Sequence, residues 1–349
     1  MVMSQPGGPA ADIHAVAPLV SVIIPVRNDA RRLGRCLASV RASRYPAERI
    51  EILVADNGSV DDSMQVARDA GAFVLRFPDI RVSEVRNQAA RAARGEILVF
   101  VDADHELDCA WIQIAVESLR QSGAGAIGAE YYAPGDGTWV QKMYDCFRSR
   151  TPGLHQVEWL GSGSLAVWSG VFKKVGGFDS TLETCEDVDF CQRLRRDNHR
   201  LLSDGRLRSV HMGDPATLRA LFFGELWRGR DNLRVSLRGP FTLRALPSLV
   251  IPIAGLACMI LAAAGLLTVS MGGWWLVPVA AAAIAALATL RAARMLTRAN
   301  STGLATVPRA FAVALVYEVA RALALVVRTP HRVRQSGSLT TRPAREPRA

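Results

Sequence analysis

The N-terminal third of the chain alternates between short apolar runs and segments in which apolar residues recur at helical spacing. The apolar runs are rich in β-branched residues and predict strands at 19–25, 50–55, 72–75 and 97–101, of which the first and the last are expected to be buried. The segments between them end at turn residues such as Gly71 and Gly95. Strands joined by helices through short connections are typical of α/β domains. We therefore predict a Rossmann-like, mostly parallel sheet with flanking helices.

The C-terminal third has a different pattern, in which long apolar segments carry no charge. Residues 246–269 are 24 consecutive uncharged residues, and residues 274–290 are another 17. Each segment is long enough for a transmembrane helix, and the short gap between them predicts a helical hairpin. A further apolar segment, 307–327, contains three charged residues and has basic residues on both sides. We interpret it as an interfacial or re-entrant helix, with a third full span as the alternative.

The positive charge of the chain is confined to this C-terminal third. Of 42 basic and 32 acidic residues, 12 basic and 2 acidic residues follow residue 240, which leaves 30 of each kind before it. This distribution argues against a nucleic-acid partner and favours contact with membrane lipids. Arginines flank the predicted hairpin on both sides. The positive-inside rule then predicts that both hairpin ends and the preceding domain lie on the cytosolic side of the inner membrane.

The two ends of the chain and its cysteines add little. Residues 1–18 lack the basic start and apolar run of a signal peptide, so we expect a disordered lead-in there and a basic disordered tail at 331–349. The six cysteines show no CxxC pair or metal-ligand spacing, which predicts free thiols in a reducing compartment.

Two carboxylates, Asp102 and Asp104, follow the strand predicted at 97–101 with one residue between them. At the carboxyl end of a parallel strand they would face the crevice in which open α/β sheets bind ligands. Carboxylate oxygens suit Mg²⁺ or Mn²⁺, which can hold the diphosphate of a nucleotide. The alternative is that Asp102 caps a turn and Asp104 is solvated. No GxGxxG follows the first strand, which disfavours a dinucleotide cofactor.

Six short motifs occur in a defined order along residues 19–235. They are VIIPVRN at 22–28, ADNGSVDDS at 55–63, VRN at 85–87, VDAD at 101–104, VGGFD at 175–179 and CEDVDFCQRL at 185–194. Together they resemble the motifs of family 2 glycosyltransferases, and six in order are far more specific than one. The resemblance implies a GT-A fold at 19–240, with a nucleotide-binding half at 19–104 and an acceptor half at 105–214. Within residues 215–240, apolar residues and arginines interleave from 215 to 237, and this basic amphipathic pattern predicts an interfacial helix, with packing on the catalytic domain as the alternative. The membrane region would be 241–330.

The resemblance also implies roles for individual residues. Those for the nucleotide are Pro25, Val26 and Asn28 at the base and ribose, Asp56 at the base, Arg86 at the diphosphate and Asp102 at the ribose and metal. Those for the metal are Asp104 as a direct ligand and His211 as a late metal or diphosphate ligand. Asp187 would be the general base, because an acceptor hydroxyl needs a carboxylate to take its proton. Glu84 departs from the family pattern, which has a small residue near this position.

Structural interpretations stand beside these roles. Asp56 could hold an Asx turn, Arg86 could be a solvated helix arginine, and His211 could be a structural histidine. On the acceptor side we expect Glu186, Trp159 and Gly161, because aromatic side chains around a Gly-Ser turn could form the floor of a sugar pocket. Core packing is the alternative for the aromatic residues, and a favourable helix-dipole contact is the alternative for Glu186.

The sequence thus predicts an inverting, metal-dependent glycosyltransferase that transfers a sugar from a nucleoside diphosphate donor, with UDP favoured over GDP or dTDP. Its acceptor would be lipid-linked or a glycan at the cytoplasmic membrane face. A processive polysaccharide synthase is an alternative, although 225–228 only faintly resembles the QxxRW motif of those enzymes. A catalytically silent scaffold with the same fold is another. A nucleotidyltransferase is disfavoured because the first strand is not followed by a glycine- and lysine-bearing phosphate loop.

Overall fold

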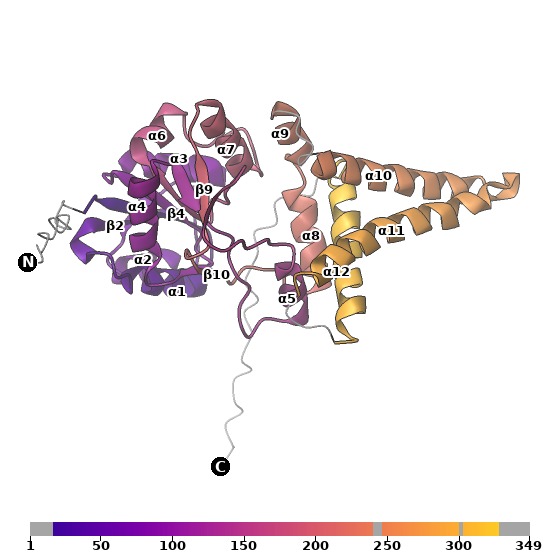
Figure 1. Ribbon diagram of the computed structural model, residues 1–349, viewed down its shortest axis with the longest axis horizontal. Coiled ribbons are helices and arrows are strands. Elements are labelled where there is room, and N and C mark those ends of the chain that lie inside the picture. Colours follow the sequence, from indigo (N-terminus) through magenta and orange to yellow (C-terminus); the bar gives the residue numbers. More distant parts are fainter. Residues whose placement is uncertain (1–16, 240–245, 300–302, 328–349) are drawn as a thin grey trace, which may run out of the picture.

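The computed structural model describes residues 17–239, 246–299 and 303–327. The tail predicted at 331–349, almost all of the lead-in predicted at 1–18, and Arg244 beside the first predicted span lie outside these ranges. Figure 1 shows an α/β body, drawn in indigo to magenta, beside a group of helices from which a long hairpin projects.

The N-terminal half of the α/β body follows the predicted alternation of strands and helices. Its elements are β1 (Val20–Val26), α1 (Ala30–Arg41), β2 (Ile50–Asp56), α2 (Ser63–Asp69), β3 (Phe73–Arg76), α3 (Val82–Ala92) and β4 (Ile97–Val101). All four strands are parallel to their neighbours, in the order β3-β2-β1-β4. The carboxyl ends of β1 and β4 therefore lie side by side, which brings their following loops together.

The remainder of the body extends this sheet and adds a small second one. Its elements are β5 (His105–Leu107), α4 (Trp111–Ser122), β6 (Ala126–Gly128), α5 (Trp139–Asp145), β7 (Leu154–Gln156), β8 (Ser164–Trp168), α6 (Ser169–Lys174), α7 (Glu186–Arg196), β9 (Leu201–Asp204) and β10 (Ser209–His211). The main sheet has the order β3-β2-β1-β4-β8-β6-β9-β7, and β10 pairs with β5 in the second. β8 runs antiparallel to β4 and β6. The mixed but mostly parallel α/β sheet confirms the predicted fold class.

Helices cover both faces of the main sheet. On β1, Val22 and Ile24 pack into a cluster with α1, α2 and α4, whereas Ile23 packs into a second cluster with α3, α6 and α7. Figure 1 shows the strands between these helices. Because neither face meets water, the central strands are apolar at nearly every position, which made them easy to recognise in the sequence.

The basic amphipathic helix expected at 215–237 is two helices, α8 (Leu218–Arg228) and α9 (Asn232–Arg238). Gly229 ends α8 where the chain packs closely on the last helix, because a Cβ there would lie 2.5 Å from the Cβ of Ala324. Asp231 then accepts hydrogen bonds from the backbone N–H groups of Glu183 and Thr184. This close approach and these side-chain contacts, which helical periodicity does not reveal, redirect the chain after Gly229.

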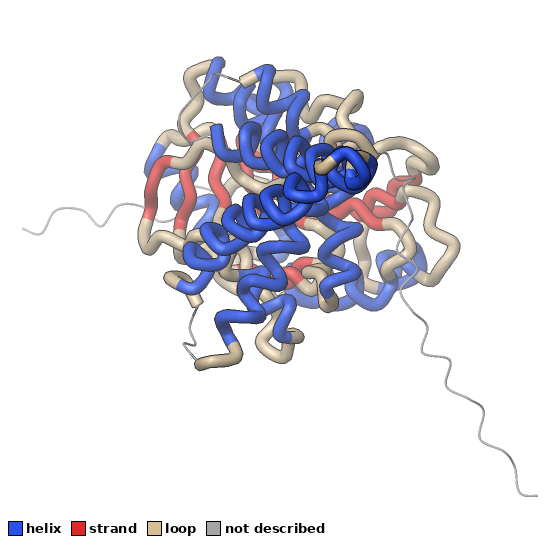
Figure 2. Tube along the Cα trace, turned by 90° about the vertical axis from the view of Figure 1, so that its right-hand side faces the viewer, coloured by secondary structure: helices blue, strands red, loops and turns tan. Residues whose placement is uncertain are grey.

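The C-terminal part contains the predicted hairpin. α10 (Leu246–Leu267) and α11 (Leu276–Leu296) are antiparallel neighbours joined by two short 3₁₀ turns, Val269–Met271 and Gly273–Trp275. Leu246–Leu267 and Gly273–Leu296 are long and apolar enough to cross a membrane and are mostly exposed along their length, which is compatible with membrane association. The second helix extends past the predicted end at 290 and includes Arg291 and Arg294. Figure 2 views the molecule along this hairpin, with the strands behind it.

The segment predicted to be interfacial or re-entrant forms α12 (Thr306–Leu323), which packs against α8, α10 and α11. Ala310, Val313 and Ala314 join a buried cluster with residues of α5, α8 and α11. Glu318 of α12 pairs with Arg291 of α11. One of the charges that interrupted the apolar pattern, Glu318, is therefore buried in an ion pair with the hairpin. Helix α12 links the hairpin to the α/β body.

Candidate active site

Most of the predicted site residues surround one cavity of about 1950 Å³ at the carboxyl ends of β1 and β4. Its lining includes Pro25, Val26, Arg86, Asp102, Asp104, Trp159, Gly161, Glu186, Asp187 and His211. These residues come from segments up to 186 positions apart, from Pro25 to His211. The fold therefore brings together residues that the sequence placed in one site only through motif order.

Asn28 and Asp56, both within the described ranges, are not among the lining residues. The buried carboxylate of Asp56 accepts hydrogen bonds from the backbone N–H groups of Gly58 and Ser59, at 3.1 Å each. This is the Asx-turn geometry that was the structural alternative for Asp56. Asn28 has a positive φ of 53°, and its Oδ1 accepts from the N–H of Val60 at 2.7 Å. Asp56 thus holds the turn after β2, and Asn28 joins the loop after β1 to that turn.

Arg86 bridges two carboxylates at the cavity wall. Its guanidinium donates to Asp102 Oδ1 and to Glu186 Oε1, at 2.6 Å each, and its side chain is 4% exposed. This buried clamp joins the end of β4 to the start of α7, 100 residues away from Arg86. The solvated-arginine alternative is wrong, because the side chain is buried and two of its guanidinium nitrogens bind protein carboxylates. The predicted contact with a diphosphate stays a prediction.

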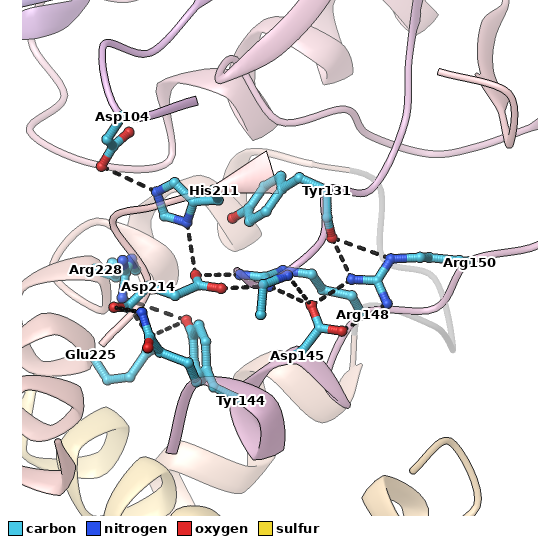
Figure 3. Close-up of polar contacts among 12 residues, drawn as sticks. Asp104, Tyr131, Tyr144, Asp145, Arg148, Arg150, His211, Asp214, Glu225 and Arg228 are labelled. Atoms are coloured by element: carbon cyan, nitrogen blue, oxygen red, sulfur yellow. Dashed lines mark hydrogen bonds and ion pairs between the residues drawn. The ribbon is translucent and has the colours of Figure 1, made fainter. Parts of the chain in front are cut away.

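A second polar chain starts from Asp104 and is drawn in Figure 3. Asp104 Oδ2 lies 3.3 Å from His211 Nε2, and His211 Nδ1 lies 2.7 Å from Asp214 Oδ1. Asp214 in turn forms a two-nitrogen pair with Arg148, at 2.5 and 2.8 Å. Although burial opposes a charged imidazole, Asp104 and Asp214 raise the pKa of His211 to about 9, so a metal ion at Nε2 would have to displace the proton held there.

This arrangement fits a divalent metal ion. The ligand atoms of Asp104, His105 and His211 lie within 4.8 Å of one another. A carboxylate that accepts from the far nitrogen of a metal-binding histidine, as Asp214 does from His211, is the common supporting contact of such sites. Asp102, the other predicted ligand, is tied to Arg86 through one oxygen and keeps the second for other contacts.

His105 was not recognised in the sequence. It is 1% exposed, its ring centroid is 4.6 Å from that of His211, and its Nδ1 has no hydrogen-bond partner among the described residues. Burial, and then the nearby charge of His211, lower the pKa of His105 to about 4, which favours the neutral ring that a metal requires. Its position immediately after the VDAD motif was the one available signal.

Two glycines allow the chain to pass close to these ligands. A Cβ at Gly213 would lie 1.8 Å from Asp104 Oδ2, and a Cβ at Gly163 would lie 2.8 Å from His105 Nε2. The Gly163 carbonyl also accepts a hydrogen bond from the N–H of Asp102 at 3.2 Å. The Gly-Ser turn predicted as part of a sugar pocket therefore also supports the end of β4.

Asp187 lies at the start of α7, beside the buried Glu186. Its carboxylate accepts hydrogen bonds from the backbone N–H groups of Val188 and Ser162, and Oδ2 points to the space beside Gly161. Burial, followed by the charge of Glu186, raises the pKa of Asp187 to about 7. Trp159, 48% exposed, lines the same part of the cavity. Asp187 is thus a carboxylate that faces open space and can hold a proton near neutral pH.

Glu84, the departure from the family pattern, has a local explanation. Its carboxylate accepts from Asn87, Gln88 and Arg91, all on α3. Asn87 in turn binds the backbone of Phe178 through both its side-chain atoms. Glu84 therefore supports the helix that carries Arg86 and does not line the cavity.

A last group of lining residues comes from the helices beyond the sheet. Glu225 and Arg228 of α8 and Tyr317 and Arg321 of α12 form the cavity wall opposite β4, together with Tyr144 of α5. Figure 3 shows Tyr144 and Glu225 below the Asp214 and Arg148 pair, and Arg228 beside Asp214. Tyr144 is one of the aromatic residues that the sequence placed around the Gly-Ser turn. The other four were not assigned to the site, because their contacts join distant segments, as Tyr144 and Glu225 are 81 positions apart.

Sequence comparison finds similar proteins that are named as glycosyltransferases. The glycosyltransferase AglE of Haloferax volcanii is 29% identical over 250 residues, which are 65% of this chain and 79% of AglE. The pre-mycofactocin glycosyltransferase of Mycobacterium tuberculosis is 27% identical over 188 residues, which are 50% of this chain but only 38% of that relative.

Among solved structures, the mannosyltransferase PcManGT from Pyrobaculum calidifontis, in complex with GDP-Man and Mn²⁺, superposes with a TM-score of 0.57. The match covers 88% of this chain and 87% of the mannosyltransferase, at 19% identity, and shows a common fold. The sequence model described as "Glycosyl transferase family 2" matches residues 21–199, which is half of the chain. The chain therefore belongs to glycosyl transferase family 2 and is a glycosyltransferase with the predicted GT-A fold.

Proposed function

We propose that this glycosyltransferase inverts the anomeric centre of a UDP-linked sugar and transfers the sugar to a lipid-linked or glycan acceptor at the cytoplasmic membrane face. Residues 19–240 would be the catalytic domain and 241–330 the membrane region. The observation that carries the proposal is the position of Asp187, whose open carboxylate lines the same cavity as the candidate metal ligands Asp104 and His211.

In this proposal Asp187 accepts the proton of the acceptor hydroxyl as its oxygen attacks the anomeric carbon. The new carbon–oxygen bond forms as the bond to the diphosphate breaks, and the nucleoside diphosphate leaves with the electron pair. Attack from the face opposite the leaving group inverts the anomeric configuration. Pro25 and Val26 would lie against the base and ribose, and Trp159 against the sugar.

Asp104 and His211 would hold Mg²⁺ or Mn²⁺, with Asp102 and the buried His105 beside them. When bound, the ion would neutralise charge on the leaving diphosphate. Asp214 would orient the His211 ring through its Nδ1. Arg86 would keep Asp102 and Glu186 in place, so that the donor side and the acceptor side of the cavity stay aligned.

Donor hydrolysis tests the proposal without knowledge of the acceptor. The full chain, purified in detergent, is incubated with UDP-, GDP- and dTDP-linked sugars in Mn²⁺, in Mg²⁺ and in a chelator. We expect hydrolysis of a UDP-sugar that requires a divalent ion, with the released sugar first appearing as the inverted anomer by NMR. Hydrolysis of a GDP-sugar instead would contradict the donor, and retention would contradict the mechanism. Failure to bind any nucleotide would favour the silent scaffold.

A further inference from the structure

Two arginines at the helix side of the cavity share one carboxylate. Arg228 Nη1 of α8 lies 2.9 Å from Glu225 Oε1, and Arg321 Nη1 of α12 lies 3.9 Å from Glu225 Oε2. Glu225 also accepts a hydrogen bond from the Tyr144 hydroxyl at 2.7 Å. Among the described residues, Glu225 is the one carboxylate within 4.0 Å of either arginine.

This part of the cavity wall therefore carries an excess positive charge. The side chains of Arg228 and Arg321 are 32% and 13% exposed, so neither is fully hydrated. The nearby cations are already matched, since Arg148 pairs with Asp214 and Asp145 and Arg291 pairs with Glu318. Partly buried charge without a full counter-charge is costly unless a ligand supplies it. An anionic ligand group between these two arginines would complete the balance.

The arginine pair lies near the start of α7, the helix that carries the candidate base. Cys185 Sγ is 3.8 Å from the backbone oxygen of Arg228, and Cys185 precedes Asp187 by two positions. Burial raises the pKa of the Cys185 thiol, the charge of Asp187 raises it further, and the charge of Arg321 lowers it. Arg228 and Arg321 therefore lie near the segment that leads into Asp187, and Arg228 is also close to Tyr131, whose ring centroid is 4.8 Å from that of the candidate metal ligand His211.

The same pair lies next to the apolar helices. Arg321 belongs to α12, which packs along α10 and α11, and Ser248 of α10 also lines the cavity. Figure 1 shows α12, in yellow, at the base of the projecting hairpin. A molecule with its polar end between the arginines would have the apolar helices within reach of its other end.

From these positions we infer that Arg228 and Arg321 form a phosphate-binding subsite on the acceptor side of the cavity, and that the acceptor is carried on a lipid phosphate or diphosphate. Arginine forks bind phosphate oxygens through paired, charge-assisted hydrogen bonds. The inference rests on the proposed function and names the chemistry of its acceptor. The donor diphosphate is the other phosphate that could reach this wall, and the experiment separates the two.

The test measures binding to the full chain in nanodiscs of phosphatidylcholine, by calorimetry. The probes are farnesyl phosphate, farnesol as its matched partner without the phosphate, and UDP with Mn²⁺ for the donor side. We expect farnesyl phosphate to bind about tenfold or more tightly than farnesol. In Arg321→Gln this ratio of affinities should fall about tenfold. The same substitution should leave UDP affinity unchanged, which also shows that the variant is folded.

Matched variants sharpen the result. Arg309→Gln on α12 and Arg219→Gln on α8 change exposed arginines that do not line the cavity, and both should bind farnesyl phosphate as the wild type does. Glu225→Gln removes the shared carboxylate while it keeps the side-chain shape, so it should tighten farnesyl phosphate binding several-fold. An affinity for farnesyl phosphate that rises in Glu225→Gln and falls in Arg321→Gln distinguishes a phosphate subsite from a general disruption of this part of the cavity.

Three results would overturn the inference: equal affinity for farnesyl phosphate and farnesol, an unchanged preference in Arg321→Gln, or a loss of UDP affinity in Arg321→Gln. The last would assign the arginines to the donor diphosphate. Failure of the proposed function is a separate outcome, because it appears as absent donor hydrolysis by the wild-type protein in Mn²⁺, whatever the farnesyl phosphate affinity.

Discussion

Glu186 and Asp187 are adjacent carboxylates whose surroundings give them different properties. Glu186 is buried and paired with Arg86 at 2.6 Å, so its charge is matched inside the protein. Asp187 receives only backbone hydrogen bonds in the contacts described above, and its pKa is raised to about 7. A pair of acidic groups with such different environments is the usual way in which one becomes a proton acceptor and the other a support.

Asp187→Asn should separate a catalytic role from a structural one. Asparagine keeps the shape and most hydrogen bonds but cannot accept a proton, so transfer should fall by roughly 10²–10⁴. UDP affinity should survive, because Asp102 and Asp104 are unchanged. If Asp187 only stabilises the start of α7, the cost is at most about 1 kcal/mol of stability and turnover stays near wild type. Transfer and UDP affinity, measured on one preparation, decide between these outcomes.

The raised pKa of Asp187 predicts the pH dependence of transfer. The carboxyl is protonated below its pKa of about 7, and a protonated carboxyl cannot accept the acceptor's proton, so transfer should be lost as pH falls through about 7. Glu186→Gln removes a negative charge that raises this pKa, so the acid limb should move to lower pH. Glu117→Gln, an exposed change on α4, is the control. An acid limb that stays in place in Glu186→Gln would contradict the assignment.

The loops after β4 and β10 depend on each other through Gly213. A Cβ at this position would overlap Asp104 Oδ2 at 1.8 Å, and the backbone N–H of Met212 donates to the carbonyl of Asp104 at 2.8 Å. The metal ligands are therefore positioned by two short elements that approach each other without room for a side chain. A change outside the ligands should then remove metal binding.

Gly213→Ala should behave like Asp104→Ala in metal-dependent nucleotide binding. In both variants the carboxylate is lost from its place, so we expect Mn²⁺ to give no increase in UDP affinity by calorimetry. Gly135→Ala is the matched control, because a Cβ there meets nothing within 4 Å. Normal Mn²⁺-dependent UDP binding in Asp104→Ala would show that Asp104 is not a metal ligand. Normal binding in Gly213→Ala alone would show that the backbone near residue 213 shifts to accommodate the added methyl group.

The sequence predicted the elements that are long and uniformly apolar and missed those that are short. β1 and β4 were recognised because helices bury both of their faces, whereas β5, β6 and β7 have three residues each, too few to show a period. Motif order identified the cavity residues from Pro25 to His211. It could not identify Arg228 and Arg321, because the pairing around Glu225 depends on how α8 packs against α12.

The arrangement of the α/β body and the hairpin restricts how the protein can meet a membrane. α10 has 22 residues, which corresponds to about 33 Å and matches the thickness of a bilayer core. Trp274 and Trp275, 64% and 54% exposed, lie in the turn at the far end of the hairpin, where an aromatic residue suits the membrane interface. Arg291 and Arg294 lie near the opposite end of α11, close to the body. The body and the tip would therefore face opposite sides of the bilayer.

We expect both ends of the hairpin on the cytoplasmic side and its tip outside, because arginines border the hairpin only where it meets the body. A reporter fused after Arg298 should be active in the cytoplasm, and one fused at Gly272, in the turn, should be active in the periplasm. If both reporters are cytoplasmic, the hairpin does not cross and α10 and α11 lie along the membrane surface. A periplasmic result after Arg298 would invert the topology and place the cavity away from cytosolic nucleotide sugars. Replacing Arg291, Arg294 and Arg298 by glutamine in the same fusions tests the cause, since the orientation should then become mixed.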